Sequence, residues 1–217
     1  NTNVENPIIG KLGRSYSDKP EVVIRHSRIV LDALHEKGIL SAIKHFPGHG
    51  SSTGDSHTGF VDVTKTWSSI ELIPFKTIIS AGACDMVMTA HIFNQKLDPK
   101  WPATLSAKII SGMLRNEFNY DGVVVSDDMQ MKAIMAYYGM ETAIERAILA
   151  GCDVLIFANN SVFEEDIAVR AVAIIKKLLQ KGAIGADRIV DSNRRIKRLK
   201  EKICSPTSNR EITENLR

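Results

Sequence analysis

One short segment, KHFPGHGSSTGDSH at residues 44–57, concentrates groups that can transfer protons. Asp55 and His57 are separated by a single residue, so the carboxylate can accept a hydrogen bond from one imidazole nitrogen while the other nitrogen faces a substrate. Such a contact fixes the tautomer of the imidazole and tunes its proton affinity. The spacing is typical of a general acid/base pair, whereas a lone histidine in a glycine-rich loop is usually only solvated.

The beginning of the same segment carries two further polar groups at the end of an apolar run. Lys44 and His45 end the stretch SAIKHF, and Pro47 with Gly48 then stops regular structure and allows a tight turn. Lysines at strand ends are often only surface cations, and we expect His49 to do no more than cap the turn. The stretch therefore delivers Lys44 and His45 to the face of the fold at which the predicted strand ends.

A second group of polar residues, SDDM, follows the apolar run GVVV. Burying paired carboxylates at the end of a strand is costly without a task or a partner. One such task is nucleophilic attack at an anomeric carbon, because a carboxylate can form a glycosyl ester and later release it. We assign Asp127 to this chemistry and expect Asp128 to cap the following helix.

The elements that must position these groups alternate along the chain. Predicted strands cover residues 41–46, 85–91, 122–128 and 153–160. Predicted helices cover residues 20–37, 70–81, 106–118, 129–150, 164–181 and 187–203. This alternation indicates an α/β fold with parallel strands.

Two observations favour a (β/α)8 TIM-type barrel over a doubly wound sheet. Polar residues follow the carboxyl end of every predicted strand, where barrel enzymes place their sites, and no GxGxxG or P-loop sequence follows any strand. A closed barrel needs about 250 residues. We therefore expect residues 1–204 to be the carboxyl-terminal part of a single barrel domain that lacks its first strands, followed by a polar tail at 205–217.

Composition sets further limits. The chain has 217 residues, of which 44% are hydrophobic, and its 28 basic and 25 acidic residues are too evenly balanced to favour a nucleic-acid or membrane partner. Three widely spaced cysteines, Cys84, Cys152 and Cys204, are typical of reduced thiols and favour the cytoplasm. No apolar run is close to the length of about 20 residues that a membrane-spanning helix needs. An exported form stays open, because the sequence begins with Asn1 and not with methionine.

Several motifs in this order resemble one enzyme family. KHFPGHG, the DSH that follows it, MTAHI, PATLS, GVVVSDDM and AGCDVLI are together similar to the glycoside hydrolase family 3 β-N-acetylglucosaminidases, the peptidoglycan-recycling β-hexosaminidases. The similarity runs from about Asn6 to Ile203. It implies a (β/α)8 barrel and a retaining exo-β-N-acetylglucosaminidase that releases terminal N-acetylglucosamine from small carbohydrates such as peptidoglycan fragments.

The resemblance also implies roles for single residues. Asp127 matches the nucleophile, His57 the acid/base and Asp55 the carboxylate paired with it. Three residues match those that hold the hydroxyl groups of the sugar, namely Arg14, Lys44 and His45. The resemblance implies neither a metal nor an organic cofactor, and it leaves the oligomeric state open.

Three alternatives remain at this point. A metal-dependent hydrolase could use His45, His49, Asp55 and His57, but Pro47 makes the helix that such histidine spacing requires improbable. An inactive or sugar-binding fragment of the same fold is the second alternative. The third is a β-N-acetylglucosaminide phosphorylase, because a histidine acid/base repels an anionic acceptor less than a carboxylate would.

Overall fold

The centre of the molecule is a parallel sheet of four strands. The computed structural model describes residues 2–56, 59–160 and 163–203. In spatial order the strands are β1 (Ala42–Phe46), β3 (Met86–Thr89), β5 (Val123–Asp128) and β6 (Val154–Ile156). Each lies within a predicted strand, and all neighbouring pairs are parallel. As expected, the sheet does not close into a barrel within the described residues, and β1 and β6 are its edge strands.

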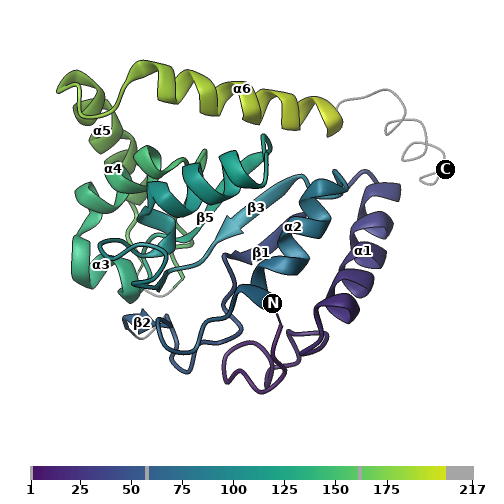
Figure 1. Cartoon of the computed structure of the whole chain (residues 1–217). Coiled ribbons are helices and arrows are strands. Elements are labelled where there is room, and N and C mark those ends of the chain that lie inside the picture. The colour runs from purple at the N-terminus through teal and green to yellow at the C-terminus, as the bar shows by residue number, and fades with distance from the viewer. Residues whose placement is uncertain (1, 57–58, 161–162, 204–217) are drawn as a thin grey trace.

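Helices surround the sheet (Figure 1). Along the chain they are α1 (Pro20–Glu36), α2 (Leu72–Ser80), η3 (Lys108–Glu117), α3 (Lys132–Tyr138), α4 (Met140–Ala150), α5 (Ile167–Gln180) and α6 (Ala186–Ile203). Two short helical turns, η1 (Ser69–Glu71) and η2 (Ala103–Leu105), and a two-stranded sheet of β2 (Val61–Asp62) and β4 (Ile92–Phe93) occupy the connections. Strands and helices thus alternate as the sequence predicts.

The prediction of one helix over residues 129–150 is wrong. The chain forms α3 and α4 instead, and Gly139 between them has a φ of +68°. Its backbone N–H donates to the Met135 carbonyl, which ends α3. Glycine adopts this left-handed conformation without a steric penalty, so a break is favoured at this position.

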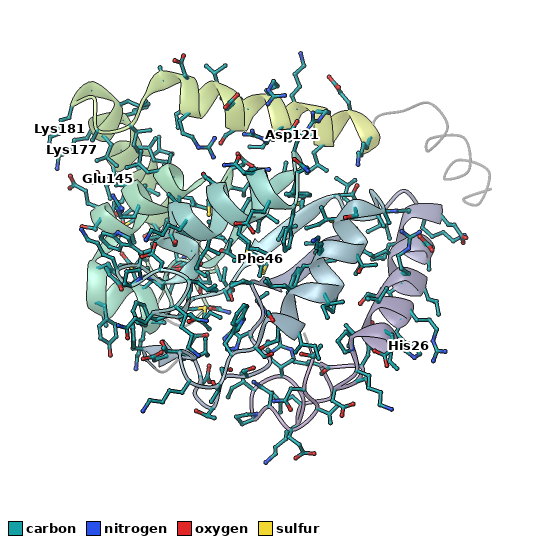
Figure 2. The ribbon with its side chains drawn as sticks, viewed as in Figure 1. His26, Phe46, Asp121, Glu145, Lys177 and Lys181 are labelled. Carbon is teal, nitrogen blue, oxygen red and sulfur yellow. The ribbon has the colours of Figure 1, made fainter. Side chains whose placement is uncertain are left out.

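Aromatic side chains fill the core beneath the site. Phe46, the last residue of β1, is fully buried and lies at the centre of the molecule (Figure 2). Its ring meets those of Phe75 and Phe118 edge to face, with centroids 5.4 and 6.0 Å apart. This packing fixes the end of β1, and with it the residues that precede Phe46.

At the opposite end of the sheet, α6 crosses the starts of three strands (Figure 1). Basic residues of α6 bind the aspartate that precedes each of those strands; Asp121 lies beneath the helix (Figure 2). The pairs are Lys202 with Asp85 at 2.8 Å, Arg198 with Asp121 at 2.9 Å and Arg188 with Asp153 at 3.0 Å. Burial acts to raise the pKa of Asp85, but hydrogen bonds, the largest from Lys202, lower it to about 2.

The described helices include none with the length and apolar character of a membrane-spanning segment. Cys84 and Cys152 are free thiols, and burial raises the pKa of both to about 12. Cys204 and the predicted tail at 205–217 lie outside the described residues, so the division into a domain and a tail stays a prediction.

Asp153, just before β6, is a fully buried carboxylate at the starts of the strands. It accepts hydrogen bonds from Arg115 at 2.6 Å and Arg188 at 3.0 Å. The Val124 backbone N–H and the Ser192 hydroxyl donate at 3.0 and 2.9 Å. The negative charge compensates three guanidinium groups that are themselves largely buried, since that of Arg195 also lies 3.5 Å away.

We expect Asp153→Asn to lower the free energy of unfolding by about 3 to 5 kcal/mol, because it leaves buried guanidinium charge without its partner. Urea denaturation measures the change. Asp32→Asn, which removes a pair with Arg28 on the exposed face of α1, is the matched control and should leave the midpoint unchanged. Equal midpoints for Asp153→Asn and the parent protein would show that this network does not stabilise the fold.

Candidate active site

The carboxyl ends of β1 and β5 bring His45 and Asp127 together. His45 Nε2 lies 3.7 Å from a carboxylate oxygen of Asp127, although β3 separates their strands in the sheet. The His45 side chain is 9% exposed and that of Asp127 is 21% exposed, so the carboxylate faces a partly open space. Burial is the largest cause that lowers the pKa of His45 well below its usual value, so this imidazole is neutral at neutral pH.

His49 lies against His45 and is more than a turn cap. The two rings meet edge to face with centroids 5.8 Å apart, and His49 is buried. Burial lowers the pKa of His49, while the charges of Asp127 and Asp55 act in the opposite direction. His49 bonds within the turn, where its Nδ1 lies 2.7 Å from Ser52 Oγ, and it also packs against His45, so the expectation that it does no more than cap the turn is incomplete.

A third buried histidine, His91, follows β3. Its Nε2 donates to the Asp128 carbonyl at 2.9 Å, and its Nδ1 lies 2.8 Å from the Thr104 hydroxyl. Burial lowers the pKa of His91, and the charge of Asp127 partly opposes that shift. His91 thus braces the strand that carries Asp127 without adding a charge beside it.

Asp128 does not cap the following helix. Its carboxylate accepts hydrogen bonds from the backbone N–H groups of Gln130 and Ala158, each at 3.0 Å, and α3 begins only at Lys132. The side chain therefore ties the end of β5 to the loop after β6. Sequence reasoning missed this role because Ala158 is 30 residues away.

Asn6 holds the turn after β1 from a distant part of the chain. Its side-chain nitrogen lies within hydrogen-bonding distance of the carbonyl oxygens of His49, Gly50 and Ser52, at 3.0, 2.9 and 2.8 Å. Asn6 is itself almost fully buried. Because a buried carbonyl needs a donor, the two N–H groups of this one side chain stabilise the turn.

Glu71 holds the same turn from the other side. Its carboxylate accepts from the Gly50 N–H at 2.7 Å and from the Ser51 hydroxyl. A Cβ atom on Gly48 would lie 2.5 Å from the Cβ of Glu71, and one on Gly50 would lie 2.1 Å from the Thr2 carbonyl oxygen. Both glycines are therefore required by close packing, and Gly48 also has a φ of +117°.

The predicted acid/base loop is described in part. His57 lies outside the described residues, whereas Asp55 is half-buried and its charge acts on the pKa of His49. The carbonyl of Ser56 accepts from the Ala133 N–H in α3 at 3.2 Å. This contact fastens the loop to the helix that follows the strand of Asp127.

Arg14 and Lys44 line one cavity of about 230 Å³ between α1 and β1. Lys44 is exposed, and the positive charges of both residues contribute to the lowered pKa of His45. Two of the three predicted sugar-binding residues thus line one cavity, whereas the third, His45, does not. Among the described residues, no three histidine, cysteine or acidic side chains converge to hold a metal ion.

The parallel sheet with helices around it is typical of part of a barrel-type α/β fold. Residues 1–199 match the family model described as the glycosyl hydrolase family 3 N terminal domain. The chain therefore belongs to glycosyl hydrolase family 3. A curated beta-hexosaminidase from Tolumonas auensis is 34% identical over 183 residues, which are 83% of this chain and 52% of that protein. This chain therefore spans about half the length of that relative.

Solved structures give the same result. A glycoside hydrolase family 3 beta-N-acetylglucosaminidase from Paenibacillus sp. str. FPU-7 has a TM-score of 0.84 and 35% identity over 93% of this chain and 38% of its own. A beta-glucoside phosphorylase bound to 2FGlc has a TM-score of 0.79 and 26% identity over 95% and 37%. The prediction that this chain forms part of a TIM-type α/β barrel is confirmed.

We expect acidification to destabilise the protein through its buried histidines. Because folding lowers the pKa values of His45, His49 and His91, the unfolded chain binds more protons as the pH falls through about 6.5. Stability is complete above that pH and decreases below it, by up to about 1.4 kcal/mol per pH unit for each histidine. Urea unfolding at pH 7.5 and 5.5 measures this slope.

We expect His49→Asn to reduce the slope of unfolding free energy against pH by up to about 1.4 kcal/mol per pH unit, which corresponds to one proton. Comparison with the parent protein cancels the contribution of Glu71, whose pKa burial raises. His26→Asn is the control for the loss of an imidazole elsewhere, because His26 lies on α1, away from His45, His49 and His91 (Figure 2). An unchanged slope in His49→Asn would show that this imidazole is not kept neutral by burial.

Proposed function

We propose that this chain provides the catalytic machinery of a retaining exo-β-N-acetylglucosaminidase. The single observation that carries this proposal is the partly exposed Asp127 carboxylate, 3.7 Å from His45 at the carboxyl ends of two strands. A protonated imidazole at that distance would pair with the carboxylate and weaken it as a nucleophile. Because His45 is kept neutral by burial, Asp127 retains its charge for attack on an anomeric carbon.

In the first step, Asp127 forms a bond to the anomeric carbon as the bond to the leaving oxygen breaks. His57, paired with Asp55, gives its proton to that oxygen. In the second step, water attacks the glycosyl ester, His57 takes the proton from water, and the Asp127 carboxylate is released. Aspartate and histidine therefore both return to their starting states after each turnover.

Arg14, Lys44 and His45 are proposed to hold the hydroxyl groups of the terminal sugar. Arg14 and Lys44 line one cavity beside β1. His45, which is also on β1, lies 3.7 Å from Asp127. Similarity to a beta-hexosaminidase and to a beta-N-acetylglucosaminidase supports N-acetylglucosamine as the sugar. Fragments of peptidoglycan are the proposed natural substrates, since they present terminal β-linked N-acetylglucosamine.

Transfer to phosphate is the second candidate function. The structural similarity to a beta-glucoside phosphorylase and the two cations that line one cavity favour it. Product analysis with and without inorganic phosphate separates the two reactions, because only phosphorolysis yields a sugar 1-phosphate. A preference for a glucoside over the matching N-acetylglucosaminide would contradict the proposed substrate in either case.

For the intact protein, we expect Asp127→Ala to abolish turnover of every substrate, because no other group forms the glycosyl ester. We expect His57→Ala to lower turnover of chitobiose by about 10² to 10⁴-fold, the usual contribution of a general acid. An aryl N-acetylglucosaminide with an activated leaving group needs little protonation and should lose much less. Steady-state kinetics with both substrates measures the difference.

Trapping with a fluorinated sugar adds a test of the covalent step. Mass spectrometry of the digested protein should place the adduct on the peptide that contains Asp127. An adduct on another carboxylate would refute the role of Asp127, and equal losses for both leaving groups in His57→Ala would refute the acid role of His57. An inactive sugar-binding protein would show binding without an adduct.

A further inference from the structure

We propose that His49 is a positioning residue that holds His45 beside Asp127 and, through Ser56, holds the loop that carries Asp55. This inference rests on the proposed function, because it assigns His49 a task in that reaction. His49 is 4% exposed, so its ring is enclosed by protein. It therefore acts through its neighbours and not by touching the substrate.

On one side, His49 supports His45. The edge-to-face contact between the rings, with centroids 5.8 Å apart, limits the orientations that the His45 ring can adopt. His45 Nε2 in turn lies 3.7 Å from Asp127. The contact between the two buried rings thus fixes the position of His45 relative to Asp127, the proposed nucleophile.

On the other side, His49 reaches the loop through two serine hydroxyls. Its Nδ1 lies 2.7 Å from Ser52 Oγ, and its Nε2 lies 3.5 Å from Ser56 Oγ. Both serines are buried. Since a neutral imidazole has one donor and one acceptor nitrogen, it can serve both hydroxyls at once without a charge.

The positions of Ser52 and Ser56 are fixed by separate segments. Asn6 lies 3.0 Å from Ser52 Oγ, and the Ala133 N–H donates to the Ser56 carbonyl. His49 therefore joins two anchored points that flank the residues from Thr53 to Asp55. A shift of the ring would be passed to the Asp55 carboxylate, and misplacement of a catalytic group by about 1 Å can cost on the order of 10²-fold in rate.

The test uses the dependence on the leaving group in the intact protein. His49→Phe keeps a ring against His45 but removes both nitrogen contacts, and Ser56→Ala removes one of them. We expect His49→Phe to lower turnover of chitobiose at least about tenfold, with a much smaller loss for an activated aryl N-acetylglucosaminide. Ser56→Ala should change the ratio of the two rates in the same direction.

The double variant shows whether the two residues act together. If His49 works through Ser56, the effect of the double variant on that ratio should be smaller than the product of the single effects. Ser111→Ala is the matched control, because its hydroxyl donates to the Ala150 carbonyl on the outer helices, and it should keep the parent ratio. Should His49→Phe fail to fold, Ser56→Ala by itself carries the test.

The outcomes separate this inference from the proposed function. Equal losses for both substrates in His49→Phe and Ser56→Ala, with the leaving-group dependence of His57→Ala intact, would overturn the positioning role alone. Absence of hydrolysis by the parent protein, or of any leaving-group dependence in His57→Ala, would overturn the proposed function and this inference together.

Discussion

The contact between His45 and Asp127 is the interaction on which the rest of the site depends. β3 separates the two strands, yet the parallel arrangement places their carboxyl ends at one edge of the sheet. Burial keeps His45 neutral, so it can offer a hydrogen bond but cannot cancel the charge of the carboxylate. The low polarity of the core thus keeps a neutral imidazole beside a carboxylate that is partly exposed.

Carboxylates at the two ends of the sheet have opposite surroundings. At the strand starts, Asp153 is bound by guanidinium groups and is fully enclosed, which stabilises the fold and removes the carboxylate from chemistry. At the strand ends, Asp127 is partly exposed and its described neighbours in the core include the lowered-pKa imidazoles of His45, His49 and His91. The fully enclosed carboxylate and the partly exposed one thus lie at opposite ends of one sheet.

The features that could be predicted from the sequence are those that depend on residues close together along the chain. Apolar runs gave the four main strands, and their ends identified Asp127 and His45, because parallel strands present their carboxyl ends together. The roles of Asn6 and Glu71 could not be predicted, since they lie 43 and 21 residues from the turn positions that they bind. His49 was misjudged for the same reason: its glycine neighbours indicate a turn, whereas its burial against His45 depends on the tertiary fold.

The loop that follows β1 is held by separate contacts in its first and second halves. Its first half, from Gly48 to Ser52, is bound by Asn6 on one side and Glu71 on the other, and close packing leaves no room for side chains at two positions. Its second half is tied through Ser56 to α3, which follows the strand of Asp127. A nucleophile and an acid/base must keep a common reference frame over two chemical steps. The contact between Ser56 and Ala133 fastens the loop of Asp55 to the helix that follows the strand of Asp127, and it would give the proposed nucleophile and acid/base that common frame.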